Sequence, residues 1–416
     1  MRKDYALIVF SHLRWDFVYQ RPQHLLSRMA ANHRVIFIEE PIYKKGIEPQ
    51  WTTSEPENNV LVCQAIIPTL GGAFGNEQTE MLAPMVRDLM EREGITDYVA
   101  WFYTPMALPL LHLIKPEPLA VVFDCMDELS AFKGAPKPLL EREAKLLIEA
   151  DLVFTGGRSL YEAKKDRNPK VFCLPSSVDA KHFSASKTMP EAEDMHGIPH
   201  PRLGFYGVID ERMDLDLLDS IAKARPEWQL VIVGPIAKIE KTSLPVHSNI
   251  HYLGPKTYGE LPSYLAGWDV CLLPFALNES TRFISPTKTL EYMAAELPII
   301  STPIKDVEGS YSNIVYLAGT PAEFIAACET ALNASADERQ ARSEAMREVL
   351  STTSWDSTAN QMQDLIEQAI EEKQGNQTTR GTVTGANETP GSDYSGHTAR
   401  AATSRSSLDV AAHSAS

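Results

Sequence analysis

The segment 274–303 places a lysine and a glutamate on one face of a predicted helix. Its sequence is PFALNESTRFISPTKTLEYMAAELPIISTP, in which Pro286 suits the first position of a helix and Ser285 suits its N-cap. The free backbone N–H groups of Thr287 and Lys288 would then lie beside the Lys288 ammonium. A helix end combined with a cation binds anions, and a diphosphate would fit there.

Glu291 follows Lys288 on the same face, one turn along the helix. A carboxylate at that place can accept hydrogen bonds from two neighbouring hydroxyls, such as those of a ribose. A capped helix with a surface lysine–glutamate pair has the same spacing. The pattern therefore stays open between a nucleotide site and an ordinary helix end.

A second group of candidates follows the first apolar run, in SHLRWDFVYQRPQHLLSRMA, where Pro22 opens a helix. The loop before this helix carries His12, Arg14 and Arg21 among several aromatic side chains. Arg21 could pair with a phosphate or a carboxylate, whereas a lone histidine such as His12 is more often structural than catalytic.

Two carboxylates, Asp124 and Asp127, lie at and just after the end of the apolar run 120–124. At the carboxyl end of a strand they could bind hydroxyl groups of a substrate or act as a base. Capping of a helix by Asp127 is an equally good interpretation.

These candidates need a scaffold, and short apolar, β-branched runs alternate with helical patterns along most of the chain. Runs of this kind are typical of buried parallel strands joined by helices. The expected strands fall into two series, residues 6–10, 35–39, 60–67, 99–103, 120–124, 152–155 and 171–174, and then 203–207, 229–234, 250–253, 270–274, 299–302 and 314–317.

A polar, proline-containing stretch separates the two series. We therefore expect an α/β chain of two Rossmann-like domains, with parallel sheets whose carboxyl ends face a central cleft. The tail has few large apolar residues, and its composition predicts disorder. The expected divisions are a first domain 1–185, a linker 186–201, a second domain 202–352, a helix 353–373 that returns to the first domain, and the tail 374–416.

Charge and cysteine content restrict where the protein works and what it binds. A formal net charge of −16 argues against nucleic-acid binding, which needs a basic surface. Five dispersed cysteines without a CxxC pair fit reduced thiols in the cytoplasm better than disulfides or a zinc site. No apolar stretch approaches the length of a membrane span, so any membrane contact is expected to be peripheral.

With these motifs in this order, most of residues 5–372 resembles the family 4 retaining glycosyltransferases, which have the GT-B fold. The stretch SPTKTLEYMAAELPII is similar to the donor-site helix of that family, and its second motif glutamate corresponds to Glu291. The position of the first motif glutamate holds Phe283, and this departure leaves open how the donor sugar is held.

Three further stretches extend the resemblance. PSSVDAKHF is similar to the end of the family's N-terminal domain. GFYGVIDER takes the place of its phosphate loop, which implies that Gly207 and Arg212 lie at the diphosphate. NIHYLG is similar to the strand that contacts the nucleotide base, which implies that Tyr252 and Leu253 lie there.

The resemblance implies a cytoplasmic enzyme that moves a sugar from a nucleoside diphosphate sugar to a hydroxyl of a glycan or lipid-linked acceptor, with retention of configuration. It implies no metal ion or cofactor besides this donor. The acceptor side would be formed by the candidates His12, Arg14, Arg21, Asp124 and Asp127.

Two alternatives remain at this stage, because one fold serves many functions. A nucleotide-sugar epimerase on the same fold would turn over a sugar nucleotide without an acceptor. A non-catalytic nucleotide-sugar sensor would bind it without turnover.

Overall fold

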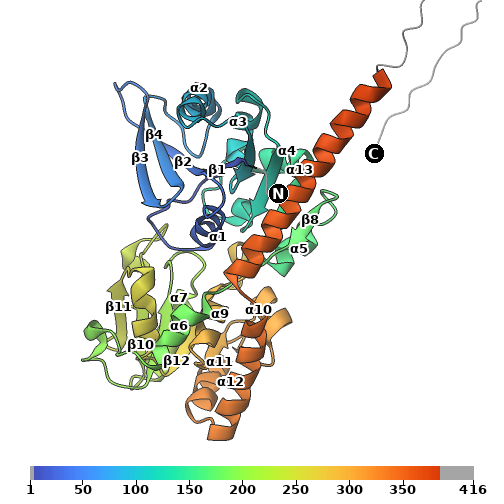
Figure 1. Cartoon of the computed structure of the whole chain (residues 1–416). Helices are drawn as coiled ribbons and strands as arrows, with labels where there is room; N and C mark the ends of the chain where they lie inside the picture. The colour runs from blue at the N-terminus through green and yellow to red at the C-terminus, as the bar shows by residue number, and fades with distance from the viewer. Residues whose placement is uncertain (1–3, 385–416) are drawn as a thin grey trace, which may run out of the picture. The chain divides into compact units, whose positions relative to one another are not determined.

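The computed structural model describes residues 4–384, with side chains as far as residue 375 (Figure 1). Residues Met1–Lys373 form one compact unit, which contains two β-sheets. The expected α/β organisation with two parallel sheets is confirmed.

The first sheet has eight strands in the order β3-β4-β2-β1-β5-β6-β7-β8, and all neighbours are parallel except β3 and β4. Ile8 and Phe10 lie in the apolar layer on one face of this sheet, whereas Leu7 and Val9 lie in the layer on the other. Burial on both faces explains why these strands are continuous apolar runs. The strands are β1 (Ala6–Ser11), β2 (Val35–Tyr43), β3 (Gln50–Glu57), β4 (Val60–Ile67), β5 (Tyr98–Phe102), β6 (Ala120–Cys125), β7 (Leu152–Thr155) and β8 (Val171–Cys173).

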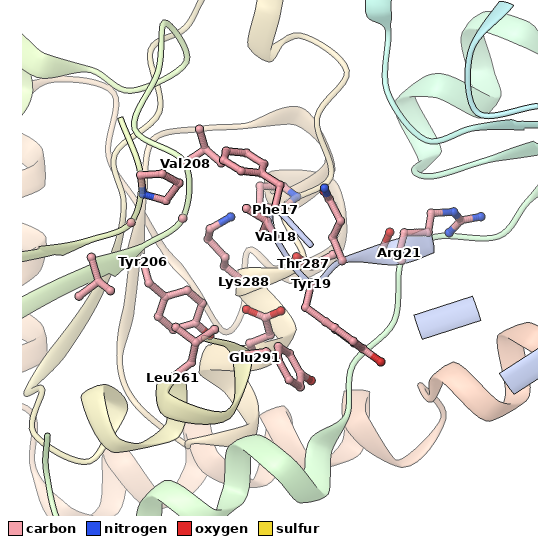
Figure 2. Close-up of a pocket in the computed structure, with 18 of the residues that line it drawn as sticks. Phe17, Val18, Tyr19, Arg21, Tyr206, Val208, Leu261, Thr287, Lys288 and Glu291 are labelled. Carbon is pink, nitrogen blue, oxygen red and sulfur yellow. The ribbon is translucent and has the colours of Figure 1, made fainter. Parts of the chain in front are cut away.

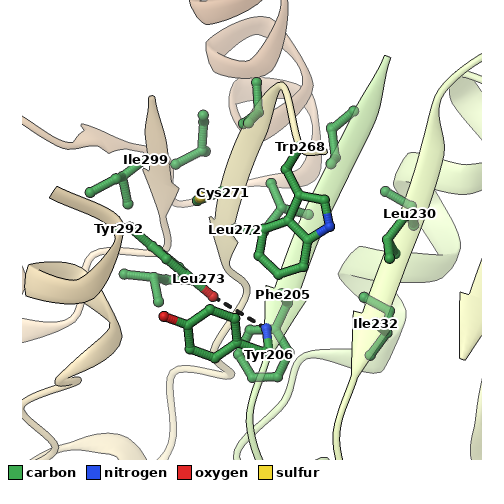
Figure 3. Close-up of a cluster of buried hydrophobic side chains, with 14 of the residues drawn as sticks. Phe205, Tyr206, Leu230, Ile232, Trp268, Cys271, Leu272, Leu273, Tyr292 and Ile299 are labelled. Atoms are coloured by element: carbon green, nitrogen blue, oxygen red, sulfur yellow. Dashed lines mark hydrogen bonds between the residues drawn. The ribbon is translucent and has the colours of Figure 1, made fainter. Parts of the chain in front are cut away.

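The second sheet has six parallel strands in the order β11-β10-β9-β12-β13-β14. Figure 3 shows part of its core, where the backbone N–H of Tyr206 donates a hydrogen bond of 3.3 Å to the hydroxyl of Tyr292. A Cβ atom at Gly204 would lie 1.9 Å from the Trp268 ring, so this ring can pack on the strand only where a side chain is missing. The strands are β9 (Arg202–Tyr206), β10 (Gln229–Val233), β11 (Ile250–Gly254), β12 (Val270–Leu273), β13 (Ile299–Ser301) and β14 (Tyr316–Leu317).

Helices join most consecutive strands, as parallel pairing requires. Their starts follow local chemistry, since the Asp214 carboxylate accepts a hydrogen bond of 2.8 Å from the backbone N–H of Leu217 at one helix start. The helices are α1 (Arg21–Met29), α2 (Asn76–Arg92), α3 (Leu108–Leu113), α4 (Leu139–Glu149), α5 (Arg158–Lys164), α6 (Ala180–Ser184), α7 (Leu215–Ala224), α8 (Leu261–Leu265), α9 (Lys288–Ala294), α10 (Lys305–Tyr311), α11 (Pro321–Leu332), α12 (Ala336–Ser351) and α13 (Trp355–Thr384).

All thirteen strands expected from the apolar runs are present, with differences only at their ends. Strand β3 was not expected. Its sequence, QWTTSEPE, is polar and largely exposed, because β3 lies at the edge of the first sheet and pairs with β4 alone. A strand of this kind carries no apolar run that would reveal it.

Residues 186–201, expected as a linker, are packed against the second sheet. Ala192, Met195 and Ile198 belong to the apolar core of that sheet, and a short 3-10 helix, Glu193–Met195, lies among them. These three side chains give a mainly polar segment enough buried surface to fold.

Helix α13 packs its first turns into the core of the first sheet, through Trp355, Met362, Ile366 and Ile370. Within the compact unit, the Lys373 ammonium lies 2.8 Å from the Asp151 carboxylate. The helix continues to Thr384, although disorder was expected from residue 374. Extending an existing helix costs far less than starting one, which explains this difference. The rest of the expected tail, 385–416, lies outside the described residues.

Among the residues that the structure describes, no helix combines the length and the apolar character needed to cross a bilayer.

Candidate functional site

A cavity of about 590 Å³ opens where the strands of both sheets end (Figure 2). Most of its residues lie at or after the carboxyl ends of strands in both sheets, which is the usual place for ligands in open α/β sheets. The first sheet contributes residues 15–21, 126, 127, 156 and 176, and the second contributes 205–208, 212, 233–235, 255–258, 260, 261, 275, 284–288 and 291.

The predicted donor-site residues Ser285, Thr287, Lys288 and Glu291 all line this cavity. The helix itself begins later than expected, because α9 starts at Lys288 with Thr287 as its N-cap, and Ser285 does not cap it. The backbone between Ser285 and the helix forms a turn first, in which Thr289 N–H donates to the carbonyl of Pro286.

Lys288 and Glu291 are half-buried on the cavity wall, and each affects the charge of the other. Burial lowers the pKa of Lys288, whereas the nearby Glu291 carboxylate raises it again. Burial raises the pKa of Glu291, and the Lys288 ammonium counteracts this rise. Figure 2 shows both side chains directed into the same hollow as Tyr206.

Gly207 allows the lysine to reach this position. Its φ of 141° lies in a region that side chains disfavour. A Cβ atom there would lie 2.3 Å from Cε of Lys288. The loop after β9 therefore requires a glycine at position 207, where the Lys288 side chain passes close to its backbone.

Arg212 also lines the cavity, at the end of the same loop. Its guanidinium makes a two-point contact with the Asp210 carboxylate, with Nη2 2.6 Å from Oδ2, and lies 5.4 Å from the centre of the Phe132 ring. Asp210 and Phe132 thus hold the cation in a fixed position beside the cavity.

Tyr252 and Leu253, expected at a nucleotide base, do not line the cavity. The Tyr252 hydroxyl donates to the carbonyl of Pro245, at 3.1 Å. Strand β11 is the edge strand of the second sheet, and the chain reaches the cavity only after this strand ends. The wall at this place is formed by residues 255–258 and by Glu260 and Leu261.

Two acceptor-side candidates, Asp127 and Arg21, line the cavity, and of these two Asp127 is partly exposed whereas Arg21 is buried. Burial raises its pKa to about 6, although Arg212 and Lys238 favour the charged form. Asp127 does not cap a helix, because the following 3-10 helix, Leu129–Ala131, has Glu128 at its N-cap.

Arg21 and Asp124 bind each other instead of a substrate. Nε of Arg21 lies 3.0 Å from both carboxylate oxygens, Nη2 lies 2.8 Å from Oδ1, and Nη1 donates to the carbonyl of Leu174 at 2.9 Å. The two side chains are 1% and 0% exposed. They form a buried ion pair, of which Arg21 belongs to the cavity wall and Asp124 does not. Figure 2 shows the Arg21 guanidinium directed away from Lys288 and Glu291.

Arg14 and His12 lie off the cavity wall. The Arg14 guanidinium contacts the Glu39 carboxylate at 3.0 Å and the carbonyl of Glu40 at 2.7 Å. Burial lowers the pKa of His12 to about 4. The loop expected to bind the acceptor therefore lines the cavity, but His12 and Arg14, which were expected to face the acceptor, do not take part.

Several aromatic residues of the wall were missed. Phe17 and Tyr19 come from the loop after β1, whose aromatic content was visible in the sequence, and Tyr206 and Tyr258 come from the second sheet. The Tyr206 hydroxyl lies beside the Glu291 carboxylate, and burial together with this carboxylate raises the pKa of Tyr206. The hydroxyl of Tyr258 is buried without a hydrogen-bond partner among the described residues. Buried polar groups usually have partners, so the Tyr258 hydroxyl is suited to meet a ligand.

No group of three or more histidine, cysteine, aspartate or glutamate side chains within residues 4–375 is arranged to hold a metal ion. All five cysteines are free thiols, as their spacing led us to expect.

Comparison with known proteins places this cavity in context. Residues 200–334, which include all the lining residues of the second-sheet wall, match the family described as Glycosyl transferases group 1. The putative teichuronic acid biosynthesis glycosyltransferase TuaH of Bacillus subtilis (strain 168) is 25% identical over 296 residues, which are 66% of this chain and 73% of that protein.

Solved structures share the arrangement of both sheets. Sucrose-phosphate synthase from Thermosynechococcus elongatus aligns with a TM-score of 0.69 and 14% identity, over 88% of this chain and 100% of that one. An E. coli structure described as trehalose-6-phosphate bound with UDP-2-fluoro glucose aligns with a TM-score of 0.66 and 13% identity, over 87% of this chain and 99% of that one. These similarities confirm the expected GT-B fold.

Proposed function

We propose that this chain is a glycosyltransferase that moves a sugar from a nucleoside diphosphate sugar to a hydroxyl acceptor. The observation that carries this conclusion is the cavity between the two sheets, into which Lys288, Arg212 and Glu291 project from the wall formed by the glycosyltransferase group 1 segment. The relative TuaH is named as a glycosyltransferase as well.

The donor binds on the second-sheet wall under this proposal. Lys288 and Arg212 face the diphosphate, whose negative charge grows as the bond to the sugar breaks. Cations that are already in position stabilise this charge without reorganisation, and the two residues take the role that a metal ion has in other transferases. Glu291 accepts hydrogen bonds from the ribose hydroxyls.

The acceptor binds on the first-sheet wall, where Asp127 can accept a hydrogen bond from the attacking hydroxyl or remove its proton. The resemblance to family 4 supports retention of configuration. It also supports a glycan or lipid-linked glycan as acceptor, in keeping with the polysaccharide named for TuaH. Reduced cysteines support a cytoplasmic site of action, with at most peripheral contact with a membrane.

Substitution of Lys288 and Glu291 tests the proposal. Lys288→Ala should lower the single-turnover rate more than it weakens donor binding, because the lysine interacts more strongly with the transition state. Glu291→Ala should mainly weaken donor binding, by about 1–3 kcal/mol for the loss of a charged hydrogen-bonding group. Calorimetry gives the affinity, and rapid quench gives the rate.

Lys223→Ala is the matched control, because Lys223 pairs with Asp219 on an exposed helix face outside the cavity. It should leave both quantities unchanged. If the Lys288 and Glu291 variants are folded and behave like this control, the second-sheet wall does not bind the donor. Turnover without any acceptor, to an epimerised sugar nucleotide, would replace the transferase assignment with an epimerase.

A further inference from the structure

The two walls of the cavity differ in their charged residues. The second-sheet wall carries three cations and two carboxylates, namely Arg212, Lys256, Lys288, Glu260 and Glu291. On the first-sheet wall, the charged residues are Asp16, Arg21 and Asp127. Whether the first wall can accept an anionic ligand therefore depends on whether Arg21 is available.

Arg21 is not available, because its guanidinium is engaged by the protein. Nε and Nη2 of Arg21 donate hydrogen bonds to the Asp124 carboxylate, and Nη1 donates to the carbonyl of Leu174. With 1% of its side chain exposed, Arg21 offers no charge to a ligand. Arg14, the other arginine of this loop, is bound to Glu39 away from the cavity.

The part of the first wall that remains open is apolar and acidic. Phe17 and Tyr19 are 53% and 36% exposed, and Val18 lies between them. Figure 2 shows Phe17, Val18 and Tyr19 grouped at the cavity across from Lys288. The Tyr19 ring also packs against Tyr258 of the opposite wall, with ring centres 4.7 Å apart, which fixes its position.

We propose that the acceptor subsite takes a neutral sugar ring, without a phosphate or carboxylate beside the hydroxyl that reacts. The apolar C–H face of the ring packs on Phe17, Val18 and Tyr19, and its hydroxyls donate hydrogen bonds to Asp127. This inference rests on the proposed function and defines the acceptor class for it.

An anionic substituent at this subsite would meet Asp16 and Asp127 at close range, and like charges in a partly desolvated site repel each other. On this wall, none of the described lining residues supplies a free cation to offset the repulsion. Arg212 and Lys238 lie near enough to Asp127 to lower its pKa. Lys238 does not line the cavity, and Arg212, like Lys288, faces the diphosphate of the donor under the proposed function.

The test compares matched sugars on the protein saturated with whichever of UDP, ADP and GDP binds most tightly. Saturation-transfer NMR measures competition among methyl glycosides of glucose, galactose, mannose and N-acetylglucosamine, the 6-phosphates of the same glycosides, and the methyl uronides of the three hexoses. At least one neutral glycoside should bind at least tenfold more tightly than its charged counterparts. The double variant Phe17→Ala/Tyr19→Ala should abolish this binding.

A gain-of-charge variant separates electrostatics from folding. Val18→Lys adds a free cation to the first wall and should improve binding of the 6-phosphates at least tenfold. The matched control Val246→Lys adds the same charge at a residue that is 87% exposed and outside the cavity, so it should change nothing.

Three results would overturn the inference. The first is that the charged sugars bind as tightly as the neutral ones. The second is that none of the neutral glycosides binds. The third is that Val18→Lys is folded but does not bind the 6-phosphates more tightly. If a nucleotide still binds in any of these cases, the inference about the acceptor is wrong but the proposed function is not contradicted. If none of the three nucleotides binds, both the proposed function and this inference fail.

Discussion

The buried ion pair between Arg21 and Asp124 should be among the most important polar contacts for the stability of the first sheet. Arg21→Met removes a guanidinium that bridges Asp124 and the carbonyl of Leu174, while a side chain of similar length remains. The Asp124 carboxylate, 0% exposed, is then left without its cation. Breaking a buried pair in this way costs about 3–5 kcal/mol.

The loss should also depend on pH in a definite direction. Burial raises the pKa of Asp124, and the Arg21 charge opposes that rise. In Arg21→Met the folded-state pKa of Asp124 therefore lies well above its value in the unfolded chain. Stability is then greatest below the unfolded pKa of roughly 4 and falls as pH rises through the folded pKa. The loss in free energy of unfolding, relative to the parent protein, should thus be larger at pH 8 than at pH 5.

Urea unfolding followed by tryptophan fluorescence measures this effect, since Trp15, Trp101 and Trp355 all lie in one apolar core layer of the first sheet. The double variant Arg21→Met/Asp124→Leu removes both charges and should recover at least about 2 kcal/mol of the loss, because buried ion pairs can be replaced by apolar groups.

Arg28→Met is the control, because the Arg28–Asp356 pair is 27% and 76% exposed and should contribute no more than about 1 kcal/mol. If Arg21→Met costs as little as Arg28→Met, or if the double variant is no more stable than Arg21→Met, the ion pair does not have the structural role assigned to it.

Three further predictions concern the cavity and its surroundings. Because the pKa of Asp127 is raised to about 6, transfer should fall as the pH drops below about 6 and this carboxylate is protonated; Asp127→Asn should remove that dependence, as pH–rate profiles of both proteins will show. Gly207→Ala places a Cβ atom 2.3 Å from Cε of Lys288, so it should weaken donor binding in calorimetry while the far-ultraviolet circular dichroism stays unchanged. The Asp306 carboxylate now accepts a hydrogen bond of 2.9 Å from the buried backbone N–H of Ser159, and Asp306→Ala leaves this N–H without an acceptor. The substitution should lower the free energy of unfolding by about 1–3 kcal/mol. A loss below about 0.5 kcal/mol, which is the usual size for a surface substitution, would contradict this role.

The fold could be predicted from the sequence wherever burial on both faces leaves a continuous apolar run. This holds for β1 and β5, whose residues are buried throughout. It fails for β3, which is stabilised by backbone pairing at a sheet edge and leaves no apolar pattern. It also fails at residues 374–384, where helix continuation decides the structure.

The donor wall was predicted better than the acceptor wall, for a physical reason. Lys288 and Glu291 are close in sequence, so helical spacing alone places both on one face. Tyr252 was misplaced because its position depends on where an edge strand ends relative to a cavity formed by other strands. Residue spacing along the chain contains no information of that kind.

The acceptor loop shows why charge in a sequence is a poor guide to a binding site unless the partners of each charge are known. Arg21 was chosen as a ligand-binding residue because of its chemistry. Asp124, 103 positions later in the chain, satisfies the same chemistry inside the protein. A buried arginine has to be paired, since an unpaired charge in the interior is too costly. Because Asp124 pairs with Arg21 inside the fold, this cation is not available to a ligand. The wall is formed instead by neighbouring aromatic residues such as Phe17 and Tyr19, whose rings offer apolar surface.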